Sequence, residues 1–101
     1  ELLLQPQRQV SMTLKEIKEA RAAGASSEET LSSLDTYIAA HPEDDEALTE
    51  RALLNWAMGK RSAAINDHLA AVRLNPKSRS GQALKAAYEI LNFYNKDLYN
   101  P

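Results

Sequence analysis

Apolar residues recur at helical spacing along the chain from about residue 10 onward. Over 10–23, Val10, Leu14 and Ile17 fall at positions i, i+4 and i+7, the spacing of one face of an α-helix. Comparable stripes predict helices within 26–42, 43–59 and 60–76, and a fifth from 78 that fades near Asn95. The pattern therefore predicts an all-α fold of about five helices.

Helix-breaking residues separate these segments. Gly24 and Gly59 stand where a glycine closes a helix or takes a tight turn, and Pro42 and Pro76 stop the helices before them. Serines and acids gather at the predicted helix starts, where they cap free backbone N–H groups and complement the helix dipole. We therefore expect short helices joined as antiparallel hairpins.

The two prolines reveal an internal repeat, because Pro42 and Pro76 stand 34 residues apart. Shifting the sequence by this interval lays Leu31 on Ile65, Ile38 on Val72 and Leu54 on Tyr88. A fixed period of this size with two helices per unit indicates a helical solenoid, in which each unit buries its apolar face against its neighbour.

The second unit, "RALLNWAMGKRSAAINDHLAAVRLNP", resembles a tetratricopeptide repeat. Its small residues and breakers match that family at five positions: Ala52, Gly59, Ala64, Ala71 and Pro76. Small residues let helix axes approach closely, and the glycine allows the tight turn. The resemblance implies a right-handed stack of antiparallel helical hairpins, about two and a half of them.

The resemblance also divides the chain. We expect an N-terminal tail over 1–9, a tetratricopeptide-like helical domain over 10–94 and a C-terminal tail over 95–101. Within the domain, 10–43 resembles a degenerate repeat in which Thr30 and Tyr37 replace the two alanines of the second helix. Residues 44–77 form the clear repeat, and 78–94 form a C-terminal capping helix.

Composition narrows the function classes. The 101 residues suit one small domain, and a net charge of -2 without a basic run disfavours nucleic acid as a partner. Apolar runs are too short to span a membrane, so no membrane partner is expected. The absence of cysteine excludes disulfides and thiolate metal sites but fits either redox compartment, and a cytoplasmic location is favoured without being determined.

Candidate chemistry is sparse, so we predict neither an enzyme nor a cofactor. His68 lies where the family places an aromatic side chain, which predicts a structural role, packed or half-exposed. His41 precedes Pro42 at a helix C-terminus, and the acids after it suit the first turn of the next helix better than a metal site. Serines occur at helix starts, as expected for caps and not for nucleophiles.

A protein-binding surface is therefore the predicted function. In the family that this sequence resembles, the first helix of each pair lines a concave groove that holds a peptide or a helix of another protein. Glu50 would repel a carboxylate there, so apolar and basic partner residues are expected. Whether Trp56 lines the groove or belongs to the core is left open. The positions that the resemblance implies for partner binding are Glu46, Thr49, Glu50, Leu53, Trp56, Ala83, Ala87, Ile90 and Tyr94.

The last helix offers an alternative function. Two apolar stripes, one through Leu84 and Tyr88 and one through Ala87 and Ile90, leave only a narrow polar strip on what should be the polar outer face of a terminal helix. Either the tail folds back over the helix through Phe93, Leu98 and Tyr99, or the second stripe is an interface. In the second case the chain is a self-assembling homodimer without a specific groove ligand, and a third alternative is a module of a larger scaffold.

Overall fold

The computed structural model describes residues 12–99, with side chains as far as Phe93, and the regular structure in this range is entirely helical. The predicted all-α fold with five helices is therefore confirmed for these residues. The helices are labelled α2 (Leu14–Ala22), α3 (Ser27–Ala40), α4 (Asp45–Ala57), α5 (Arg61–Leu74) and α6 (Ser80–Tyr99).

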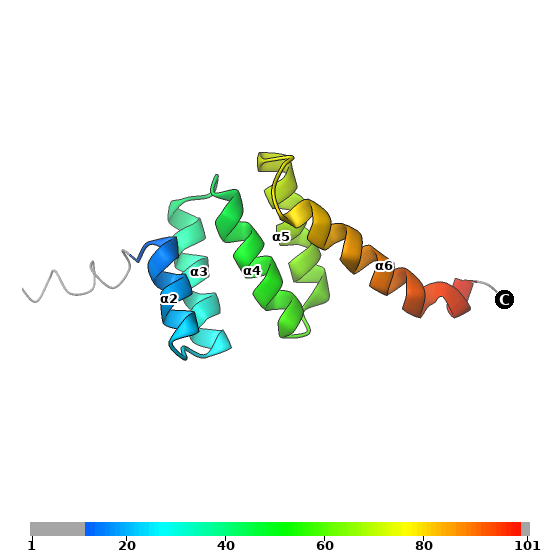
Figure 1. Cartoon of the computed structure of the whole chain (residues 1–101), viewed down its shortest axis with the longest axis horizontal. Coiled ribbons are helices and arrows are strands. Elements are labelled where there is room, and N and C mark those ends of the chain that lie inside the picture. The colour runs from blue at the N-terminus through cyan, green and yellow to red at the C-terminus, as the bar shows by residue number, and fades with distance from the viewer. Residues whose placement is uncertain (1–11, 100–101) are drawn as a thin grey trace, which may run out of the picture.

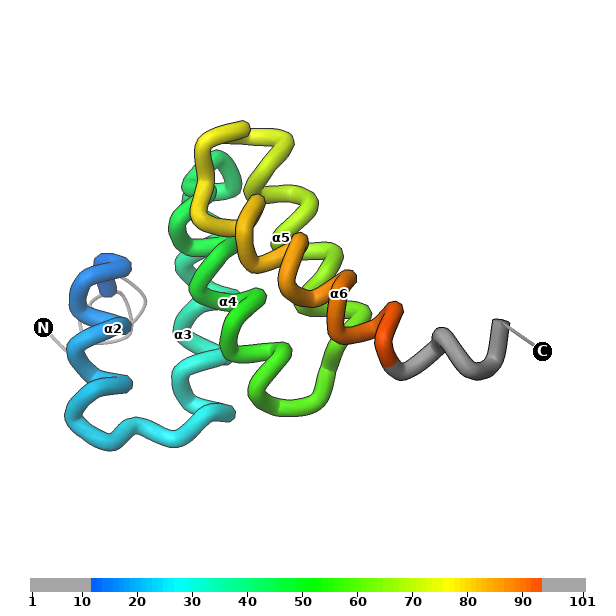
Figure 2. Tube along the Cα trace, turned by 45° about the vertical axis from the view of Figure 1, so that its right-hand side comes forward, coloured from blue at the N-terminus to red at the C-terminus, as the bar shows by residue number. Residues whose placement is uncertain are grey.

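Each helix packs against the next one along the chain, from α2 against α3 to α5 against α6, and the contact between α4 and α5 is the most extensive. Figure 1 shows α2 to α5 side by side, with α6 beginning beside α5 and running obliquely away from it. The turned view in Figure 2 shows α6 crossing the α4–α5 pair before it leaves the body of the molecule. Ion pairs connect α4 with its neighbours, because Glu50 of α4 pairs both with Lys18 of α2 and with Arg79, which directly precedes α6.

Side-chain caps set the starts of the first two helices. Thr13 accepts a hydrogen bond from the backbone N–H of Glu16 at 3.1 Å, and the Glu16 carboxylate accepts one from the N–H of Thr13 at 2.9 Å. Ser26 and Glu29 form the same reciprocal pair before α3. These capping boxes satisfy backbone donors that have no partner within the helix. The predicted start of the first helix near Val10 falls outside the described residues, and α2 begins after the Thr13 cap.

Two glycines close the hairpins in the predicted places. Gly24 has a φ of +116° and Gly59 a φ of +83°, a backbone region that side chains with a Cβ atom rarely adopt. Pro42 and Pro76 each follow a helix that has ended two residues earlier, at Ala40 and Leu74.

The core lies between α2, α3 and α4, and α5 adds Ala71 to it. The buried apolar cluster consists of Ile17, Leu34, Ile38, Ala47, Leu48, Leu54 and Ala71. Alanines at 52, 64 and 71 are fully buried, which lets α5 lie close against α4.

The apolar spacing within 60–76 predicts a buried stripe of Ile65, Leu69 and Val72, but the buried face of α5 is a neighbouring one. Ile65, Leu69 and Val72 are only partly buried. The buried face of α5 consists instead of Ala64, Asp67, His68 and Ala71. The reason is that α5 packs through its small residues, while its polar residues at 67 and 68 are accepted inside because both have hydrogen-bond partners.

The last helix is longer than predicted. The sequence pattern indicated a helix that fades near Asn95 and a tail over 95–101, whereas α6 continues to Tyr99. A backbone that continues as a helix through 95–99 does not fold back over α6, so that alternative is wrong, although the side chains of Leu98 and Tyr99 lie outside the described ones.

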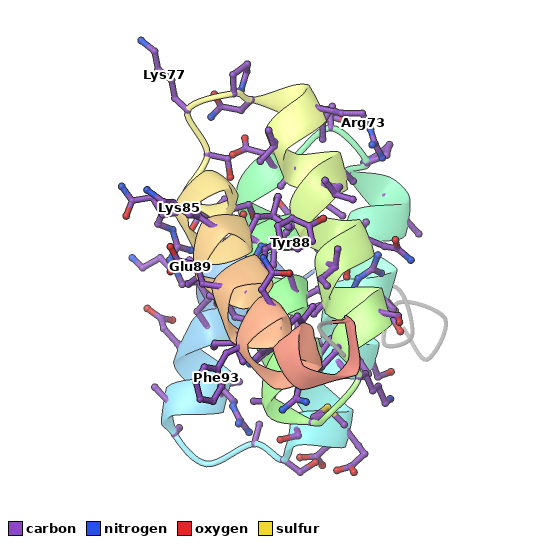
Figure 3. All side chains as sticks on the ribbon, turned by 90° about the vertical axis from the view of Figure 1, so that its right-hand side faces the viewer. Arg73, Lys77, Lys85, Tyr88, Glu89 and Phe93 are labelled. Carbon is purple, nitrogen blue, oxygen red and sulfur yellow. The ribbon has the colours of Figure 1, made fainter. Side chains whose placement is uncertain are left out.

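The exposed surface of α6 carries polar and apolar side chains next to one another, as the sequence pattern indicated. Leu84 and Ala87 are buried against the body. The exposed side chains include the polar residues Lys85, Glu89 and Asn92 and the large apolar residues Tyr88, Ile90 and Phe93. In Figure 3, Lys85 and Glu89 project from α6, while Tyr88 lies on the side toward α5. The first predicted stripe is thus covered only at Leu84, and apolar side chains remain exposed where a terminal solenoid helix would be polar.

Candidate functional site

A cleft of about 350 Å³ lies between α2 and α4, with its floor on α3. Its walls are largely apolar because Ile17, Leu34, Leu53 and Leu54 contribute to them. Leu53 is 42 % exposed, whereas Leu54 beside it is buried. The full lining is Ile17, Lys18, Arg21, Ala22, Thr30, Leu34, Glu50, Leu53, Leu54 and Ala57. We call this cleft the α2–α4 groove.

Two of the predicted residues, Glu50 and Leu53, line the α2–α4 groove, but the charge of Glu50 is not free. Its carboxylate lies 2.9 Å from a guanidinium nitrogen of Arg79 and 3.7 Å from the Lys18 ammonium. Glu46 also pairs with Arg79, and its hydrogen bond raises the pKa of that guanidinium. The acids that favoured a basic partner are therefore already paired with cations of this chain.

Thr49 is not a groove residue, which corrects its predicted role. It is only 1 % exposed, and its hydroxyl lies 2.7 Å from Ser80 Oγ and 3.1 Å from Ser78 Oγ. The Ser80 hydroxyl also lies 2.6 Å from His68 Nδ1. This cluster joins α4, α5 and the start of α6. His68 is buried, as the sequence predicted, and the Ser80 side chain is fully buried beside it, so this serine is closed to a substrate.

Trp56 lies outside the lining of the α2–α4 groove, and it is only partly buried. The guanidinium carbon of Arg61 stands 5.1 Å from the centre of its ring, the geometry of a cation–π contact. The side chain thus packs over the turn between α4 and α5, and neither of the two predicted roles describes it fully.

The predicted partner-binding residues of α6 do not form one surface. Ala87 is buried, so it does not offer a surface to a partner as predicted. Ala83 is partly buried and offers only a small surface. Ile90 is 41 % exposed, and it lies with Ala86, Glu89 and Phe93 beside a shallow depression. Tyr94 lies outside the described side chains. Of this group only Ile90 offers a clearly accessible apolar side chain.

Sequence analysis missed a polar cluster on the opposite side of α4. The Arg51 guanidinium donates to both carboxylate oxygens of Asp67, at 2.8 and 2.9 Å, and to Asp35 at 2.9 Å. Asn55 donates to Asp67 as well, at 3.3 Å. Hydrogen bonding to Asp67 raises the pKa of Arg51, so the guanidinium stays charged. The three charged residues are far apart in sequence and belong to three helices, so no local spacing pointed to them.

Among the side chains that the structure describes, His, Asp and Glu do not gather in a group of three or more that could hold a metal ion. Within the same part of the chain, the helices are too short or too polar to span a membrane.

Comparison with known proteins adds no assignment. No protein-family model, no curated protein and no solved structure matches this chain significantly. What the site does must therefore be inferred from the residues themselves.

Proposed function

We propose that this chain is a non-catalytic protein-binding module built as a tetratricopeptide-like, right-handed stack of antiparallel hairpins. Three features support the proposal: the 34-residue interval between Pro42 and Pro76, the left-handed backbone at Gly59, and alanines buried where the family places small residues. Consecutive helices that pack pairwise agree with it.

The observation that carries the binding proposal is the apolar α2–α4 groove with its exposed Leu53. An apolar side chain at the rim of an apolar cleft gains stability when a partner covers it. The groove takes a segment of another protein, a peptide or a helix, with apolar side chains directed toward Leu53.

Charge selects among such segments. Lys18 and Arg21 stand on the α2 side of the groove, while the one acid of the lining, Glu50, is already paired with Lys18 and Arg79. The uncompensated charge at the rim is thus positive. The partner segment carries a carboxylate beside its apolar residues, on the side that meets Arg21.

The test is selection from a displayed peptide library on the native chain, followed by affinity measurement for each selected peptide. Leu53→Glu is expected to weaken binding at least about tenfold, because covering a leucine contributes roughly 1.5–3 kcal/mol. Leu74→Glu is the matched control, because Leu74 is 47 % exposed and outside the groove lining. If no peptide is selected, or if both variants bind alike, the groove proposal fails.

A second pair of variants tests the charge. Arg21→Glu is expected to weaken acidic peptides several-fold, whereas Arg73→Glu, an exposed residue of α5 outside the groove lining, leaves them unchanged. Selected peptides that are basic instead of acidic would contradict the assigned partner chemistry and leave the groove itself supported.

The alternative function, self-assembly through α6, has one specific observation in its favour. Tyr88 and Ile90 are exposed large apolar side chains on a helix that leaves the body of the molecule. Light scattering after size exclusion, over a concentration series, separates the two functions. A dimer that Ile90→Glu converts to a folded monomer would support self-assembly, and a monomer at every concentration would reject it.

A further inference from the structure

The start of α6 is attached to α4 and α5 by a chain of buried side-chain hydrogen bonds. His68 of α5 contacts Ser80 at 2.6 Å, Ser80 contacts Thr49 of α4 at 2.7 Å, and Thr49 contacts Ser78 at 3.1 Å. Thr49 also donates to the backbone oxygen of Asp45 at 3.0 Å. All four side chains are buried, so water does not replace these contacts.

Counting the available protons determines which group donates in each of these hydrogen bonds. There are four contacts to satisfy, Thr49 to Asp45, Ser78 to Thr49, Ser80 to Thr49, and His68 to Ser80, but only three hydroxyl protons. A carbonyl oxygen only accepts, so the Thr49 proton goes to Asp45. The Thr49 oxygen therefore accepts from both serines, which uses their protons, and the proton between His68 and Ser80 belongs to the imidazole.

We propose that His68 is held as the neutral tautomer with its proton on Nδ1, that this N–H docks the start of α6, and that uptake of a second proton at Nε2 releases α6. The surroundings make the second proton costly. His68 is only 2 % exposed, so its ring has little access to water. A charged ring would therefore be held away from water, and burial of this kind disfavours the charged form.

The acidic side chains on α4 and α5, the helices that surround His68, already have hydrogen-bond or ion-pair partners. On α5 itself, Asp67 is paired with Arg51 and bonded by Asn55. On α4, the Asp45 carboxylate accepts from Asn75, and Glu46 and Glu50 pair with Arg79 beside the start of α6. Burial disfavours the charged ring and outweighs the field of Asp67, which favours it, so the pKa of His68 is lowered from 6.5.

The direction of the pH effect follows from that shift. Because the folded state holds its proton more weakly than the unfolded chain, the unfolded state binds more protons below pH 6.5. The contribution of His68 to stability is therefore complete above pH 6.5 and is lost as the pH falls through the folded-state pKa. The element that loses its attachment in this window is α6.

Two measurements on the native chain test the proposal. Nitrogen NMR of the His68 ring at about pH 7.5 should show the proton on Nδ1. Amide hydrogen exchange should show protection in the first turns of α6 falling at least tenfold between about pH 7.5 and 5.5, while α2 and α3 change less than twofold. A proton on Nε2 in the neutral ring, or equal changes in α3 and α6, would overturn the proposal.

Two variants supply the matched pair. His68→Asn keeps an N–H donor near the position of Nδ1 but does not titrate, so α6 should stay protected at both pH values. His68→Leu removes the donor, so α6 should be poorly protected at both. If His68→Asn loses α6 protection on acidification as the native chain does, His68 is not the switch. Should either variant fail to fold, the ring NMR and exchange of the native chain still decide.

Discussion

Two buried positions of this protein, Leu34 and His68, are 34 residues apart in the sequence and equally inaccessible, with 2 % of each residue exposed. Leu34 lies in an apolar cluster with Ile17, Ile38 and Leu54. His68 lies in a chain of hydroxyl groups that ends on the backbone of α4. The same place in the repeat is thus filled in two different ways.

The apolar cluster around Leu34 and the hydrogen-bonded side chains around His68 should respond differently to mutation and to pH. An apolar contact has no direction and carries no proton, so its strength follows the area and volume that are buried. A buried polar chain holds only while every donor has its acceptor, because a single unsatisfied group costs about 1–3 kcal/mol. The first hairpin should therefore be sensitive to volume, and the second to the identity and protonation of particular groups.

The largest expected effect tests the apolar side of this comparison. Leu34→Ala should lower the free energy of unfolding by about 3 kcal/mol, because it removes a buried side chain and leaves a cavity. Urea unfolding at about pH 7.5 and 5.5 measures it, and the loss should be the same at both. Leu74→Ala, at an exposed position, should change the free energy by less than about 0.5 kcal/mol. A loss below about 1 kcal/mol at Leu34 would mean that the cluster is loosely packed.

A smaller loss of stability is expected for the polar cluster of Asp35, Arg51 and Asp67, which joins α3, α4 and α5. Arg51→Met leaves Asp67 with only its weak Asn55 contact, and we expect a loss of about 2 kcal/mol, less than for a fully buried pair because the arginine side chain is partly exposed. Arg73→Met, at an exposed position, is the control for losing a positive charge. Equal unfolding curves for the two variants would show that the Arg51 pair contributes nothing, and that the second half depends on packing alone.

The smallest effect concerns a polar contact between the end of α3 and the cap of α4. The Tyr37 hydroxyl donates to Asp44 at 2.7 Å, and this hydrogen bond raises the pKa of Tyr37 from 10.0. A raised pKa means that stability is complete below pH 10 and is lost as the pH rises through the folded-state value. As the pH rises from about 8 to 10.5, the free energy of unfolding should therefore fall less for Tyr37→Phe than for the native protein, as measured by urea unfolding. Parallel declines would show that the contact does not persist in solution.

The helices themselves were predictable because their signals are local. Spacing along one face, Gly24 and Gly59 at the turns, and the two prolines all act within a few residues, so the pattern located all five helices. The end of α6 was not located, since nothing in 95–99 breaks a helix and its polar residues only weakened the apolar pattern. Part of the α2–α4 groove was predictable, because Glu50 and Leu53 line it. Thr49 is buried instead, and the sequence pattern did not indicate that cations of α2 border the groove.

What the sequence determined by itself is thus the all-α class, the number of helices and the positions of the turns, because backbone preferences and one-sided apolar spacing act over a single turn or two. Only the tertiary structure decided which face of α5 is buried, that Arg79 pairs with Glu46 and Glu50, and that His68 meets Ser80 and Thr49. Those contacts join residues from different helices, and their geometry depends on how closely the buried alanines allow α4 and α5 to approach.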